Sequence, residues 1–154
     1  MTTYYIQRLP NEEEKRNLEI LLKTDDYEQL EYEISKFFAK VPFAYTSAGW
    51  QTAFYSNEAA WDMVEARHAD TEWKDNLESL KEVLQKKNIH IEDEYGTKYT
   101  YKAFWDRIKN SLYANENLLN HHTNPVQSPY KIPDDWEYID KDGIRWELST
   151  LRGC

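Results

Sequence analysis

The N-terminal part of the chain reads Tyr4-Tyr5-Ile6-Gln7-Arg8-Leu9-Pro10-Asn11-Glu12-Glu13-Glu14. Its first half has the aromatic and β-branched composition of a short strand. Pro10 ends such a strand, and Asn11 followed three residues later by Glu14 is the capping-box pattern of a helix start. A strand that passes directly into a helix predicts a fold that contains both kinds of element.

Two amphipathic helices are predicted after this start. In the first, an apolar stripe formed by Leu18, Leu21 and Leu22 ends near Thr24. In the second, from about residue 26 to 39, apolar residues recur at helical spacing at Leu30, Ile34, Phe37 and Phe38. Pro42 stops this helix. The chain from about residue 11 to 40 is therefore predicted to form a helical hairpin.

Strand and helix patterns alternate through the rest of the chain. Strands are expected near residues 44 and 52, about a turn at 47–49, and near residue 90, before a turn at Tyr95-Gly96. Helices are expected at about 57–64, at about 71–87, where Trp73 shares a stripe with three leucines, and after the cap Thr100. A β-hairpin is expected around Asp142-Gly143, with strands near 138 and 146.

These elements predict one domain, residues 1–154, with an α+β fold. It consists of a small, mostly antiparallel sheet with several helices packed on one side. The length suits a single domain with a real core. The stretch from about 113 to 133 has three prolines, four asparagines and no periodicity, so it is predicted to be a long loop.

The composition narrows the possible partners. The formal charge of −9 disfavours direct binding to nucleic acid or to an anionic membrane surface and favours a basic protein partner. No apolar window is long enough to span a membrane, and the first residues lack a signal-peptide pattern. The single cysteine, Cys154, provides neither a disulfide nor a cysteine-based metal cage. We expect a cytoplasmic protein, within a host cell.

Motifs for enzymatic chemistry are absent from the sequence. It contains no nucleophile elbow, phosphate-binding loop, zincin motif or calcium loop. One alternative is a small metal-dependent hydrolase, which would use His90 with Glu92 and Glu94 on one strand face, or His121 with His122. An exposed polar face explains these residues more simply. We expect no catalytic residue, no metal and no cofactor.

The acidic residues are more strongly patterned than the histidines. Residues 11 to 33 contain nine Asp or Glu against three Lys or Arg, and a second cluster lies at 92–94. Carboxylates spaced along helices can imitate a phosphate backbone, and Tyr is enriched at interface hot spots. The expected partner-binding residues are Asp26, Tyr27, Glu28, Glu31, Tyr32, Glu92 and Glu94.

Three blocks, in this order, carry a resemblance to a known group of proteins: Thr3-Tyr4-Tyr5, then Thr46-Ser47-Ala48-Gly49-Trp50, then Ile91-Glu92-Asp93-Glu94-Tyr95-Gly96. The chain resembles a widespread family of small bacteriophage and prophage proteins of unassigned function. Many of those relatives carry a Cys-x-x-Cys and a histidine that suggest a metal site. Residues 7 to 40 here contain no cysteine, and Pro42 occupies the histidine position.

The resemblance implies a phage context, and the blocks themselves are also explained by turn formation and by Trp50 anchoring a strand. We therefore expect a phage-encoded, non-enzymatic inhibitor. It would bind a host defence protein with a basic, nucleic-acid-binding cleft, such as a CRISPR effector nuclease, as a nucleic-acid mimic. A toxin-neutralising immunity protein is the second expectation from the same composition.

Overall fold

The computed structural model describes residues 1–154 except 48, 63, 65–66, 114–136 and 149–154. The described residues form a seven-stranded sheet with the order β5-β4-β1-β2-β3-β7-β6. Neighbouring strands are antiparallel except β3 and β7, which are parallel. The strands are β1 (Thr2–Arg8), β2 (Lys40–Thr46), β3 (Ala53–Tyr55), β4 (Ile89–Asp93), β5 (Lys98–Tyr99), β6 (Glu137–Ile139) and β7 (Arg145–Glu147).

Five α-helices lie within the described ranges: α1 (Glu12–Lys23), α2 (Tyr27–Phe38), α3 (Asn57–Trp61), α4 (Leu77–Leu84) and α5 (Tyr101–Ile108). The capping box at the start of α1 is confirmed. Asn11 Oδ1 accepts a hydrogen bond from Glu14 N at 2.8 Å, and Glu14 Oε1 accepts one from Asn11 N at 3.0 Å. No helix of the described part is both long and apolar enough to cross a membrane.

The helices α3, α4 and α5 share one hydrophobic core with the sheet. Phe104 of α5 is central to this core, with its ring 5.0 Å from that of Tyr4 in β1 and 5.1 Å from that of Phe43 in β2. Trp61 of α3 and Leu80 of α4 are also buried in the core. The predicted α+β fold, a mostly antiparallel sheet with helices packed on it, is confirmed.

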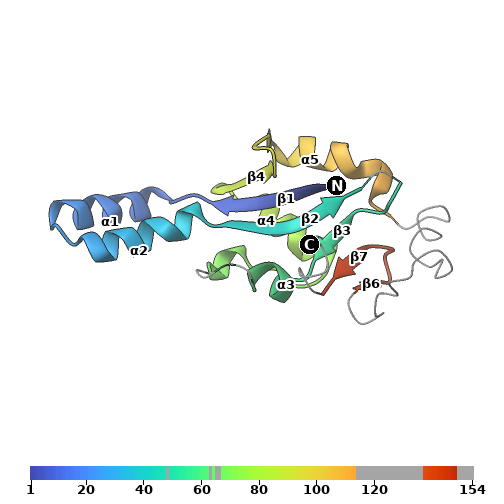
Figure 1. The fold of residues 1–154 in the computed structure, drawn as a ribbon, viewed down its shortest axis with the longest axis horizontal. Coiled ribbons are helices and arrows are strands. Elements are labelled where there is room, and N and C mark those ends of the chain that lie inside the picture. Colours follow the sequence, from blue (N-terminus) through green and yellow to red (C-terminus); the bar gives the residue numbers. More distant parts are fainter. Residues whose placement is uncertain (48, 63, 65–66, 114–136, 149–154) are drawn as a thin grey trace.

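The two longest helices, α1 and α2, do not cover the sheet. They form the predicted hairpin, which projects from the end of the sheet where β1 leads out and β2 returns (Figure 1). Gln7 of β1 pairs with Lys40 of β2, so the hairpin is an insertion between two adjacent strand ends. No residue of α1 is buried, and α2 buries only Phe37.

Local details differ from the sequence prediction at three places. The helix expected at 71–87 begins only at Leu77, because Asn76 caps it and the indole of Trp73 is held apart by a hydrogen bond to the Tyr55 carbonyl at 3.2 Å. The helix expected at 57–64 ends at Trp61. Trp50 is partly exposed and precedes β3, so it does not anchor a strand in the core.

The turn predicted at Tyr95-Gly96 and the hairpin around Asp142-Gly143 are confirmed. Gly96 has a φ of +84°, a left-handed conformation that favours glycine. The predicted long loop at 113–133 lies, apart from its first residue, outside the described residues. His121, His122 and Cys154 lie outside them as well.

Candidate protein-binding site

Aromatic and cationic side chains attach the hairpin to the sheet at the base of the hairpin, which is the end of α2 near Phe37. Phe37, the last-turn residue of α2, is only 7% exposed. The guanidinium of Arg8 lies over its ring at 5.7 Å, and the imidazole of His68 stacks on it at 5.3 Å. Gln7 Nε2 donates a hydrogen bond to the Phe37 carbonyl at 2.6 Å. This cluster joins α2 to β1 and to the segment before η1 (Ala69–Thr71).

Arg8 also fixes the first helix of the hairpin. Its Nη1 lies 2.6 Å from Glu14 Oε1 in the first turn of α1, and its Nε lies 3.0 Å from Asp70 Oδ2. Burial lowers the pKa of the Arg8 guanidinium, but its hydrogen bonds to Glu14 and Asp70 raise that pKa above its ordinary value. One cation therefore links the strand, the helix start and the body of the molecule.

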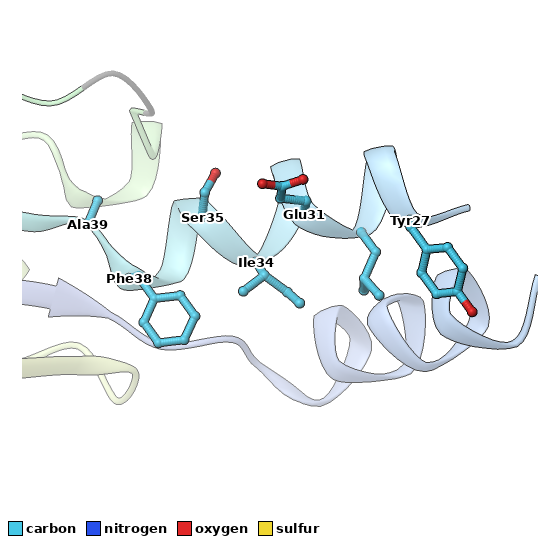
Figure 2. A pocket seen from close by; sticks show the side chains of 7 residues that line it. Tyr27, Glu31, Ile34, Ser35, Phe38 and Ala39 are labelled. Atoms are coloured by element: carbon cyan, nitrogen blue, oxygen red, sulfur yellow. The ribbon is translucent and has the colours of Figure 1, made fainter. Parts of the chain in front are cut away.

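An open apolar groove runs along one face of α2, over the whole length of the helix. It has a volume of about 600 Å³ and is lined by Tyr27, Leu30, Glu31, Ile34, Ser35, Phe38 and Ala39. Figure 2 shows Tyr27, Ile34 and Phe38 projecting to the same side of the helix. At the two ends of the groove, Tyr27 is 60% exposed and Phe38 is 71% exposed. We call this surface the α2 groove.

A smaller and more polar groove lies between the two helices. It encloses about 310 Å³ and is lined by Glu14, Asn17, Leu18, Ile20, Leu21, Gln29, Glu33 and Phe37. The apolar stripes of both helices thus meet only in part. Leu30 and Ile34 stay partly exposed, and Ile20 and Leu22 are each 56% exposed. The hairpin presents apolar surface that the described part of the chain leaves open to solvent.

Acidic residues are concentrated in the segment that carries the α2 groove. Residues 24–35 contain Asp25, Asp26, Glu28, Glu31 and Glu33 and no Lys or Arg. Asp26 caps α2 by accepting a hydrogen bond from Gln29 N at 3.3 Å, and Glu33 lies 3.4 Å from Lys36 Nζ. Glu28 and Glu31 are exposed and form no ion pair with the residues that the structure describes. Their charges are available to a partner.

Five of the seven expected partner-binding residues lie together on this hairpin: Asp26, Tyr27, Glu28, Glu31 and Tyr32. Tyr27 Oη donates a hydrogen bond to Asp25 Oδ1 at 2.9 Å, which holds its ring at the end of the groove. Tyr32 is 56% exposed but does not line the α2 groove. Lys36 Nζ lies 4.6 Å from the centre of the Tyr32 ring. The two tyrosines therefore occupy different surfaces of one helix.

The other two expected residues, Glu92 and Glu94, lie on the sheet and its following turn, apart from the hairpin surface. Glu92 is only 6% exposed, and its Oε1 lies 2.7 Å from Lys40 Nζ. Glu94 is exposed and its Oε1 accepts a hydrogen bond from Thr3 N at 3.0 Å. Burial and pairing leave Glu92 little surface for a partner.

His90, the described histidine of the alternative hydrolase site, is not surrounded by further metal-binding side chains in the described part of the chain. His90 is exposed and faces Gln7 across the sheet. Glu92 shares its strand face but is engaged with Lys40. In the described ranges, no group of three or more His, Cys, Asp or Glu residues is arranged to hold a metal ion. His68, which is not among these candidates, contacts the hairpin, with Nε2 3.2 Å from the Lys36 carbonyl.

A buried ionic cluster joins strands β2, β6 and β7, and its Tyr45 packs against the hydrophobic core. Arg145 and Trp146 are neighbours in β7, so their side chains point to opposite faces of the sheet. The ring of Trp146 packs on Phe54 in the core. The guanidinium of Arg145 contacts Glu137 at 2.7 Å, Glu147 at 2.9 Å and the Tyr45 hydroxyl at 3.1 Å. Burial raises the pKa of Tyr45. Because each charge faces an opposite one, this cluster joins β2, β6 and β7.

The α2 groove itself was not predicted from the sequence. Ile34 and Phe38 carry the groove together with Tyr27, yet their spacing alone predicted only a stripe that packs on another element. A usable signal was present, because α2 has apolar residues on more of its circumference than one neighbouring helix can cover.

No family model, curated protein sequence or solved structure matches the chain.

Proposed function

We propose that this protein is a non-enzymatic binding protein that docks its projecting hairpin into a basic cleft of another protein. The observation that carries the proposal is the form of the hairpin. It extends from the sheet (Figure 1), leaves an apolar groove open (Figure 2), and places near that groove Glu28 and Glu31, which form no ion pair within the described part of the chain. Aromatic anchors surrounded by complementary charge are typical of protein interfaces.

The partner class follows from the charge. A cleft that binds nucleic acid is lined by Lys and Arg, and closely spaced carboxylates are drawn to it by the same field that attracts phosphates. We propose that the protein acts as a phage-encoded inhibitor of such a host defence protein, with a CRISPR effector nuclease as the example. The phage context derives from the sequence resemblance, and the mimicry from residues 24–35.

A charge-reversal experiment tests this proposal. We expect purified tagged protein to capture a nuclease from a host extract, to inhibit that purified nuclease, and to release it at high salt because the attraction is screened. The variant Glu28→Lys/Glu31→Lys should lose both capture and inhibition. The matched control is Glu78→Lys/Glu82→Lys, which changes the same charge on exposed positions of α4.

Three outcomes would contradict the proposal. Undiminished capture by Glu28→Lys/Glu31→Lys would remove the hairpin from the interface. Equal loss in Glu78→Lys/Glu82→Lys would show a response to net charge alone. Capture of a toxin in place of a nuclease, with neutralisation of that toxin, would assign the protein an immunity role instead.

A further inference from the structure

We infer that the α2 groove receives a single amphipathic helix of the partner protein, with aliphatic residues facing α2 and Lys or Arg along its flanks. This inference rests on the proposed function in one respect, that the hairpin is the docking element. It goes further by assigning a secondary structure, an apolar face and a charge pattern to the segment that is bound.

The geometry of the groove suits a helix. Tyr27, Leu30, Ile34 and Phe38 recur at i, i+3, i+7 and i+11, so they form one stripe along α2. Eleven residues of helix extend about 16 Å, which matches roughly three turns of a partner helix laid alongside. A helix seated there would add a third member to the two-helix hairpin. Amphipathic helices commonly bind grooves through such anchors.

The charges around the groove select the flanks of the bound helix. Glu31 lines the groove, and Glu28 lies one turn away, so two carboxylates stand beside the stripe without an ion pair in the described part of the chain. Asp25 and Asp26 extend this acidic surface at the end of the groove where Tyr27 lies. Basic side chains at the edges of a bound helix would reach these carboxylates while its apolar face is buried.

The same charges argue against the other possible occupants. A second copy would bring two acidic hairpins together, and each chain carries a formal charge of −9. A membrane-surface helix carries Lys and Arg on its polar face, whereas residues 24–35 have neither. Nucleic acid would be repelled. A basic amphipathic helix satisfies both the apolar groove and its acidic surroundings.

Binding of defined peptides to the full-length protein provides the test. The probe is a fluorescein-labelled helix of about four turns, with leucines on one face and lysines on the other. Two matched peptides separate the contributions: one has Glu in place of every Lys, and one has the original residues scrambled so that the leucines do not share a face. We expect the first peptide to bind at least about tenfold more tightly than either of the others.

Two tyrosines on α2 provide a matched pair of variants. Tyr27 and Tyr32 are similarly exposed, at 60% and 56%, but only Tyr27 lines the groove. Tyr27→Ser and Phe38→Ser should each weaken peptide binding about tenfold, whereas Tyr32→Ser should change it less than about twofold. All three positions are highly exposed, and unchanged circular dichroism and thermal melting will verify folding. Equal effects of Tyr27→Ser and Tyr32→Ser would overturn the inference.

A photo-crosslinking amino acid at position 38 identifies the occupant. A crosslink to the leucine–lysine peptide supports the inference. A crosslink to a second copy, with a dimer in analytical ultracentrifugation, or to a segment of the same chain would overturn it. Preferential binding of the Leu/Glu peptide or of the scrambled peptide would also overturn it.

The failure of this inference can be distinguished from failure of the proposed function. If Phe38→Ser captures and inhibits the partner as well as the unmodified protein does, while Glu28→Lys/Glu31→Lys does not, the charged hairpin is the interface and the groove inference is wrong. If the charge-reversed variant keeps full capture, the proposed function is wrong whatever the peptides show.

Discussion

Asp93 organises the turn that joins β4 to β5. Its Oδ1 accepts hydrogen bonds from the backbone N–H groups of Tyr95 at 2.9 Å and Thr97 at 3.0 Å, and its Oδ2 accepts one from the Tyr99 hydroxyl at 2.7 Å. Burial raises the pKa of Asp93, but these hydrogen bonds lower it, and the resulting pKa lies below the ordinary value. Burial and the bond to Asp93 raise the pKa of Tyr99 to about 12, so its hydroxyl remains a donor at neutral pH.

Removing the Tyr99 hydroxyl should therefore destabilise the protein in a pH-dependent way. A carboxylate whose pKa is lowered by folding stabilises the native state above its unfolded pKa, and that stabilisation is lost as the pH falls through the folded pKa. We expect Tyr99→Phe to reduce the free energy of unfolding by about 1–2 kcal/mol at pH 7 and by progressively less below about pH 4. Urea denaturation across pH measures this. The exposed Tyr95 provides the control Tyr95→Phe, and a loss independent of pH would contradict the role of Asp93.

Arg145 is the cation of the buried cluster that joins β2, β6 and β7. It forms ion pairs with Glu137 and Glu147, and removing it would break the pair with Glu147, which is 1% exposed. Breaking a buried pair from one side destabilises proteins by about 3–5 kcal/mol, so we expect Arg145→Met to lose about that amount in chemical denaturation. The double variant Arg145→Met/Glu147→Gln should recover part of the loss. A double variant less stable than Arg145→Met would refute this account.

At the scale of elements, the attachment of the hairpin to the sheet depends on the end of α2 that adjoins β1 and β2. Phe37 is the one buried residue of α2, and it lies between Arg8 and His68. We expect Phe37→Ala to speed amide hydrogen exchange in α1 and α2 by about tenfold or more, because opening of the hairpin becomes easier, and to leave exchange in β1 and β4 nearly unchanged. Hydrogen exchange read by mass spectrometry measures both regions. Tyr32→Ala, also on α2 but exposed, is the control.

Local patterns predicted those parts of the fold that local interactions determine. The capping box at Asn11 and the turn at Gly96 each depend on neighbours a few residues away. The start of α4 was predicted too early, at about residue 71, because the spacing of Trp73 fits a helix. The indole of Trp73 instead donates a hydrogen bond to the carbonyl of Tyr55, 18 residues earlier in the chain. Periodicity could not show that contact.

Long-range arrangement could be predicted only in outline. The parallel pairing of β3 with β7 joins residues about ninety positions apart, and nothing in either segment specifies that partner. The same limit applies to the candidate site. The acidic residues and tyrosines of the hairpin were predicted, but an apolar stripe at Ile34 and Phe38 looks the same whether an element covers it or not. Only the projection of the hairpin shows that the described chain leaves it open.

At the scale of the whole molecule, the sheet and the hairpin have separate sources of stability. The core lies between the sheet and α3, α4 and α5, whereas α1 and α2 together contribute a single buried residue. The hairpin starts and ends at neighbouring strand ends, since Gln7 pairs with Lys40. A short turn could join these ends without changing the strand register. The hairpin is thus an addition to a sheet that does not require it for its core.

Replacing residues 10–39 by a short Asn-Gly turn tests this separation directly. We expect the shortened protein to fold with a melting temperature within about 5 °C of the full chain, because the loss of Phe37 from the edge of the core is offset by a shorter loop between β1 and β2. It should not capture the partner or bind the leucine–lysine peptide. Near-ultraviolet circular dichroism, which reports the buried aromatic residues of the core, verifies the fold. An unfolded product would show that the hairpin supports the sheet, and a folded product that still captures the partner would place the interface on the sheet, where Glu94 is exposed.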